Sequence, residues 1–124
     1  MHSVKHLRHN FESTKLLLRI GETAAAPRLL AELANNKNAL VRGAVAENIN
    51  TPCEVKLMLA EDDNPDVRFV LAESATTPLE ALRRLTEDAN PYVAYRAERT
   101  LQRLSLKQLI SPRFEYFQKT KALA

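Results

Sequence analysis

An internal repeat of 26 residues runs through the middle of this chain of 124 residues. The segment VRGAVAE at 41–47 is followed by VRFVLAE at 67–73, and a third copy begins with VAY at 93–95. Two dipeptides between these segments recur at the same spacing: Thr51-Pro52 recurs as Thr77-Pro78, and Asn64-Pro65 recurs as Asn90-Pro91. A fixed period of roughly 20 to 50 residues is typical of solenoids, in which each unit buries its apolar face against its neighbours.

Each unit is predicted to consist of two short helices. Asn64 and Asn90 are favourable N-caps, and the proline after each stands at the first helical position, where its missing N–H does no harm. This first helix could be a single turn or partly 3₁₀, because only about nine residues separate it from the next Thr-Pro. The second helix is expected to open at Thr51 and Thr77, each followed by a glutamate at the third position in a capping box.

Apolar residues at helical spacing predict which faces of these helices are buried. The expected faces are Val67, Val70 and Leu71, then Val55, Met58 and Leu59, and then Ala81, Leu82 and Leu85. Cys53 is expected to pack inside its unit, because the corresponding residue of the next copy is Leu79.

Composition agrees with a helical fold. The chain contains only two glycines, whereas an all-β fold needs many tight turns. Its single cysteine, Cys53, excludes a disulfide framework within the chain. We therefore predict an all-α fold, a short α-solenoid (superhelix) of helix-pair repeats with a period of 26 residues, capped by longer terminal helices.

The predicted organisation is a single helical-repeat domain over residues 1–124. Residues 1–22 form an N-terminal cap helix, 23–104 the repeats, and 105–124 a C-terminal cap or tail. Terminal units of a solenoid need a polar outer face to end the stack. Three repeat units are close to the minimum for independent stability of a solenoid, so a weak homodimer is an alternative to a monomer.

The repeated residues resemble a known family. The stretch VRGAVAENINTPCEVKLMLAEDDNPDVR, and its second copy VRFVLAESATTPLEALRRLTEDANPYV, are similar to the leucine-rich repeat variant and, more broadly, to HEAT-like helical repeats. The resemblance covers roughly residues 23–104 and implies alternating α and 3₁₀ helices in a right-handed superhelix. Some relatives carry a cysteine-rich iron–sulfur module, which one cysteine inside a repeat does not match. Such repeats mostly serve as scaffolds, so the resemblance points to a fold and not to a particular partner.

Charge is distributed unevenly, although the net charge is only +3. Residues 21–93 carry twelve acids against seven Lys and Arg, whereas residues 94–124 carry seven Lys and Arg against two acids. The first 20 residues are also basic. No targeting segment is expected, and the longest apolar runs are far shorter than the ~18 residues that span a bilayer. We expect a cytoplasmic protein with no membrane association.

The sequence offers no catalytic constellation and no cofactor or metal site. His2, His6 and His9 would share a helical face and could chelate zinc, but this segment is terminal and is better explained as a solvated helix. No glycine-rich phosphate loop and no grouping of Ser, His and Asp or of Cys and His is present. We therefore expect a protein that is not an enzyme.

Candidate binding residues are arginines and aromatics. Arg42 and Arg68 occupy one column of the repeat, where they either line a groove or pair with Asp62, Asp66 and Asp88 in a ladder between repeats, the ladder being favoured. The other candidates lie after residue 90, namely Tyr92, Tyr95, Arg96, Arg99, Arg103, Phe114, Tyr116 and Phe117. The aromatics fit a cap over the last repeat, a protein-docking patch, or a surface that stacks on bases.

These observations predict a non-catalytic helical-repeat scaffold that binds a protein or peptide. The alternative is nucleic-acid binding through the basic terminal segments, in the manner of HEAT-like DNA-binding proteins.

Overall fold

A computed structural model describes the backbone of residues 2–123 and the side chains of residues 13–107. Within this range the protein is all-helical, with seven helices and no strand. The helices in chain order are α1 (His2–Thr23), α2 (Pro27–Leu33), α3 (Ala39–Glu47), α4 (Cys53–Leu59), α5 (Pro65–Glu73), α6 (Leu79–Leu85) and α7 (Pro91–Leu123).

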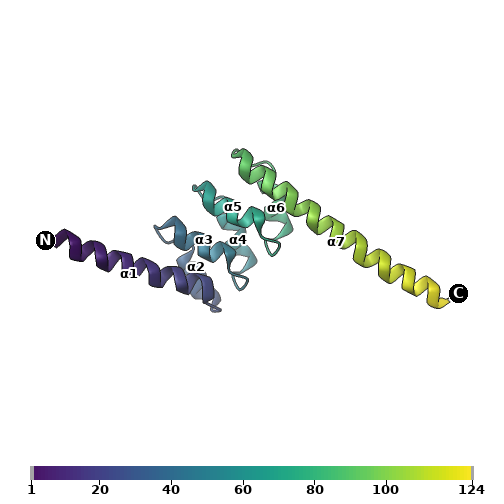
Figure 1. Ribbon diagram of the computed structural model, residues 1–124, viewed down its shortest axis with the longest axis horizontal. Coiled ribbons are helices and arrows are strands. Elements are labelled where there is room, and N and C mark those ends of the chain that lie inside the picture. Colours follow the sequence, from purple (N-terminus) through teal and green to yellow (C-terminus); the bar gives the residue numbers. More distant parts are fainter. Residues whose placement is uncertain (1, 124) are drawn as a thin grey trace.

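The helices form two rows (Figure 1). In the first row α1, α3, α5 and α7 lie side by side, and each contacts the next. The shorter helices α2, α4 and α6 make the second row, and α6 also packs against α7. The two terminal helices are longer than the others and extend past the stack on opposite sides.

Asparagine caps begin α5 and α7, as the sequence predicted. The side chain of Asn64 accepts a hydrogen bond from the backbone N–H of Asp66, and Asn90 accepts one from the N–H of Tyr92 at 2.9 Å. Asn38 caps α3 in the same way through the N–H of Leu40. Each cap satisfies one of the amides that a helix leaves unpaired at its N-terminus.

The predicted capping boxes at the second-row helices are wrong. The N-cap of α4 is Pro52, and no side-chain hydrogen bond caps this helix or α6. The buried Thr51 hydroxyl instead donates to the carbonyl of Val45 at 2.6 Å, and Thr77 donates to Leu71 at 2.7 Å. Each threonine thus adds a second hydrogen bond to a carbonyl in the last turn of the preceding helix, which also accepts the backbone N–H of Asn48 or Ser74 at 3.2 Å.

The core lies between the two rows. Its buried residues are mainly Leu, Val and Ala, and the largest fully buried side chains are Leu30, Leu59, Leu71, Leu82, Leu85, Val41, Val45, Val67 and Val93. The predicted apolar faces are therefore mostly inside. Met58 is an exception because its side chain is exposed.

Small residues allow the first-row helices to approach one another. A Cβ added at Gly21 would lie 3.2 Å from the Cβ of Ala44, so α1 and α3 are in close contact there. Ala46 and Ala72 are fully buried at corresponding positions of α3 and α5. The corresponding residue of α7 is Glu98, which is exposed, so the last helix ends the row with a charge.

Helix type and length differ from the expectation at two places. All elements within residues 2–123 are α-helices, and the 3₁₀ turns that the family resemblance implied do not occur there. The predicted boundary between repeats and tail at residue 104 falls inside α7, which continues to Leu123.

Candidate functional site

Arg42 and Arg68 form an ordered set of ion pairs with Asp62 and Asp88. Arg42 donates from Nε to Asp62 Oδ2 at 2.8 Å and from Nη2 to Oδ1 at 3.1 Å. Arg68 makes the same pair of contacts with Asp88 at the same distances. We call these four residues the Arg–Asp ladder, and it follows the predicted pattern except that Asp66 takes no part.

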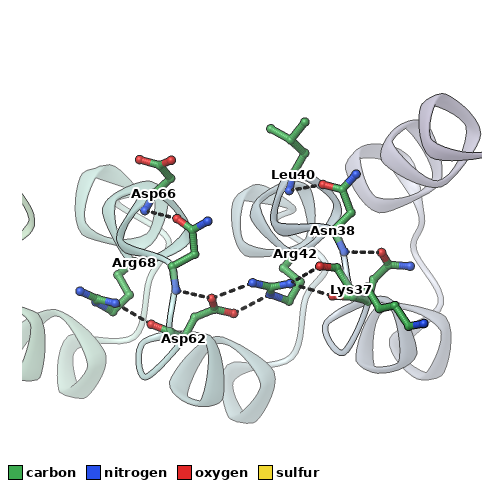
Figure 2. A network of polar contacts seen from close by, with 9 residues as sticks. Lys37, Asn38, Leu40, Arg42, Asp62, Asp66 and Arg68 are labelled. Carbon is green, nitrogen blue, oxygen red and sulfur yellow. Dashed lines mark hydrogen bonds and ion pairs between the residues drawn. The ribbon is translucent and has the colours of Figure 1, made fainter. Parts of the chain in front are cut away.

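The third nitrogen of each arginine binds backbone. Nη1 of Arg42 donates to the carbonyl of Asn36 at 2.8 Å, and Nη1 of Arg68 donates to the carbonyl of Asp62 at 2.6 Å. Figure 2 shows the network around Asp62, which accepts from Arg42 through its side chain and from Arg68 through its carbonyl. Each guanidinium therefore donates hydrogen bonds to the carboxylate of one turn and to a backbone carbonyl of the preceding turn, and so links two successive turns.

The carboxylates of the ladder are held in their charged form. Burial opposes ionisation of Asp62, but the hydrogen bonds from Arg42 and from the Asn64 amide, with the charges of Arg42 and Arg68, outweigh it. The pKa of Asp62 therefore lies below its usual value. The pKa of Asp88 is lowered by the same balance, in which Arg68 and the Asn90 amide outweigh burial.

Large apolar side chains are exposed on the first row. The exposed fractions are 68% for Leu40 at the start of α3, and 78% and 61% for Tyr92 and Tyr95 in α7. Leu40 and Tyr92 occupy corresponding positions of the repeat, and the corresponding residue of the copy between them is Asp66. Apolar groups of this size at the surface are typical of contact sites for other molecules.

Three arginines in the first half of α7 share one helical face. Arg96, Arg99 and Arg103 follow at spacings of three and four, which places them on the same side of a helix. This side adjoins α5, because Arg96 stacks over the ring of Phe69 at 5.6 Å and Arg103 donates to the carbonyl of Glu73 at 3.4 Å. Nε of Arg96 is buried without a hydrogen-bond partner among the described residues, and Arg99 is exposed.

A shallow groove of about 360 Å³ lies on the first row. Its lining comes from α1, α3 and α5 and is mostly apolar. Gly43 contributes to its surface, and a Cβ placed there would meet no atom within 4 Å. The polar part of the lining consists of Asn64 and three acidic residues, Glu22, Glu47 and Asp66.

Two second-row positions differ from what the sequence suggested. Cys53 is exposed at the start of α4, so its predicted packing role is wrong, and Leu79 at the corresponding position of α6 is also exposed. Lys56 was not singled out, yet only 2% of its surface is exposed. Lys56 stands at the position of the repeat that is occupied by the buried Leu30 and Leu82 in the other copies. The burial of Lys56 was therefore predictable from the spacing of the repeat.

The Lys56 amine has one hydrogen bond, to the Thr76 hydroxyl at 3.1 Å. Burial lowers its pKa, and the nearby Cys53 only partly offsets this effect. Unpaired charges are expensive to bury, so this lysine works against the stability of the core.

Several predicted residues lie outside the described side chains. These are the candidate chelators His2, His6 and His9, and the aromatics Phe114, Tyr116 and Phe117. Among the side chains that are described, no group of three or more His, Cys, Asp or Glu residues is placed to hold a metal ion. Over the same part of the chain, none of the helices has the length and apolar character needed to cross a membrane.

Comparison with known protein families, curated proteins and solved structures gave no match.

Proposed function

We propose that this protein is a short α-solenoid of helix-pair repeats that serves as a non-catalytic scaffold for another protein or peptide, in the cytoplasm. The 26-residue period supports the solenoid assignment, since α3, α5 and α7 begin at residues 39, 65 and 91. The hydrogen bonds of Thr51 and Thr77 and the two ion pairs of the Arg–Asp ladder repeat with the same offset.

The observation that carries the binding proposal is the exposure of Leu40, Tyr92 and Tyr95 on the first row. Tyrosine is enriched in protein interfaces, because its ring supplies contact area and its hydroxyl tolerates water. The two tyrosines lie three residues apart on α7, so they share one side of that helix.

Crosslinking in cells compares the wild type with a Tyr92→Glu, Tyr95→Glu double variant. Both side chains are exposed, so the variant is expected to keep its helical circular dichroism and melting temperature. We expect the wild type to give a specific adduct that the variant loses. An Arg83→Glu variant, altered at an exposed residue of α6, controls for a general effect of charge. Equal adducts from all three proteins contradict the proposed surface.

Nucleic-acid binding is the second candidate, and the shared face of Arg96, Arg99 and Arg103 favours it. Arg96 and Arg103 also contact α5, which leaves Arg99 as the arginine most available for phosphate. Fluorescence anisotropy with labelled single- and double-stranded DNA and RNA tests this function at low and at physiological salt. Binding that falls steeply with salt and is weakened by Arg99→Ala supports it, because phosphate contacts release counterions.

A further inference from the structure

We propose that the groove between α3 and α5 binds a basic peptide segment of a partner protein, with one bulky apolar side chain of that segment seated over Gly43. This inference rests on the proposed binding function and assigns a site and a partner chemistry to it. Three observations carry it: the position of Gly43, the apolar lining, and the charge of the rim.

Gly43 is the first observation, because the fold does not require a glycine there. The residue lies inside α3 with an ordinary helical backbone, since no glycine within the described chain has a positive φ. Packing does not require it either, because an added Cβ meets nothing within 4 Å. Glycine is among the least favourable residues in a helix interior. What its missing side chain provides is open space on the surface.

The repeat shows what normally fills this space. The corresponding residues of α5 and α7 are Phe69 and Tyr95, so Gly43 stands where the other two copies carry aromatic rings. A bulky apolar side chain from a partner would therefore occupy the position that Phe69 takes in α5, where its half-buried ring lies beneath Arg96 of α7, whereas Tyr95 on the last helix is exposed. The groove volume of about 360 Å³ is near the lower end of ligand sites, about 300 to 1,000 Å³, which suits a few side chains of a peptide.

The lining fits an apolar anchor. Its apolar members come from three helices and include Leu18, Leu40, Val67 and Val70. Leu40 is largely exposed and lies on the same side of the row as Asp66 in Figure 2, away from the Arg–Asp ladder. A partner side chain placed over Gly43 would cover Leu40 and remove its apolar surface from water.

The rim determines the charge of the partner. Glu22, Glu47 and Asp66 line the groove, and no Lys or Arg does. None of these three acids forms an ion pair among the described side chains, and all three are exposed. Such a rim attracts Lys and Arg and repels the phosphates of nucleic acids. It also disfavours a symmetric contact between two copies through this face, because the same acids would meet one another.

The test is an ¹⁵N-resolved NMR titration, for which the chain provides its own reporters. It contains only two glycines, whose amide signals lie apart from most others. Gly43 reports on the groove, and the amides of α6, which contributes no residue to the groove lining, serve as the internal control. The probe is a short synthetic peptide in which one Phe is flanked on both sides by Lys and Arg.

We expect the Gly43 signal to shift saturably with this probe while the amide signals of α6 stay in place. Replacing the Phe of the peptide by Ala should weaken binding at least about tenfold, and replacing its Lys and Arg by Glu should abolish it. Glu47→Gln should weaken binding about two- to fivefold, because it removes one exposed charge contact.

Gly43→Phe fills the groove with the residue found at the equivalent position of α5, and it should abolish binding. Gly43→Ala is the matched control, which should keep most of the affinity because a methyl group leaves the groove largely open. An unchanged melting temperature in Gly43→Phe shows that any loss is not caused by unfolding.

Equal binding of the Glu-containing peptide, retained binding by Gly43→Phe, or shifts that avoid Gly43 would each overturn the proposal. A Gly43 shift that depends on protein concentration without peptide would assign the groove to a second copy of the chain, which also overturns it. These outcomes leave the tyrosine-dependent crosslinking result untouched, so failure of the groove and failure of the proposed function are distinguishable.

Discussion

Replacement of Lys56 by leucine should stabilise the protein, although most substitutions in a core are harmful. Leu30 and Leu82 occupy the equivalent positions and are fully buried, so the fold already accommodates leucine at this point of the unit. Lys56 is almost as buried, yet its amine has only the hydrogen bond to Thr76 at 3.1 Å.

The size of the gain follows from three contributions. Full burial of a leucine side chain stabilises by ~1.5–3 kcal/mol, but the lysine stem already provides part of this. Removing the ammonium relieves its desolvation, whereas losing the hydrogen bond to Thr76 costs about 1 kcal/mol. Thr76 keeps its contact with the Ser74 hydroxyl at 2.8 Å and is exposed to water. We expect Lys56→Leu to raise the free energy of unfolding by about 1–2 kcal/mol, or the melting temperature by about 4–8 °C.

Urea unfolding at neutral and at alkaline pH checks this value. Burial lowers the pKa of Lys56, so the unfolded chain holds this proton more tightly than the folded protein does. The stability of the wild type should therefore rise with pH between the lowered pKa and the ordinary lysine pKa, and its difference from Lys56→Leu should shrink. Lys37→Leu, at an exposed lysine, is the control and should change stability by less than about 0.5 kcal/mol. A destabilised Lys56→Leu protein, or a difference that does not change with pH, would refute this reasoning.

Four further predictions concern the ladder, Thr51 and Gly43. A double-mutant cycle of Arg42→Ala and Asp62→Ala should give a coupling energy of about 1–3 kcal/mol, whereas the exposed pair of Arg84 and Glu61 should give less than about 1 kcal/mol. Because the pKa values of Asp62 and Asp88 are lowered, their contribution to stability should be present above the ordinary aspartate pKa and fall away as pH drops through the lowered values; Asp62→Asn, measured by thermal melts across acidic pH, should flatten this dependence. Thr51→Val should cost about 0.5–1.5 kcal/mol in chemical unfolding, since the buried Val45 carbonyl loses the Thr51 hydroxyl and keeps only the longer hydrogen bond from the Asn48 amide, whereas substitution of the exposed Thr23 should cost little. Gly43→Ala should stabilise α3 by about 1 kcal/mol in the same assay, and a loss of stability would show that the added methyl group is not accommodated.

Much of the helical arrangement was predictable because its determinants are local. The asparagine caps of α5 and α7 act within three residues, so the sequence alone places the starts of both helices. The apolar spacing that buries Val67 and Leu71 is likewise a property of one helix. The partners of Arg42 and Arg68 were also predictable in outline, because arginine and aspartate recur in fixed columns.

The errors concern residues whose role depends on a neighbouring element. Thr51 matches a helix-capping pattern, but the carbonyl of Val45 competes for its hydroxyl and the turn brings the two together. Cys53 shares a column with Leu79, yet neither is buried, because the start of each second-row helix faces water. The groove at Gly43 depends on three helices that are distant in sequence, and no single segment contains it.

The position of Asp62 has a consequence for how the protein loses its structure. One residue closes a turn through the Asn64 amide, holds the Arg42 of one unit and receives the Arg68 of the next. Neither unit can open alone without breaking contacts made by the other, so the middle of the chain should unfold in one cooperative step. Amide hydrogen exchange is then expected to give similar protection to α3 and α5, in contrast to repeat arrays that melt one unit at a time. The ladder thereby couples the unfolding of each unit to the unfolding of its neighbour.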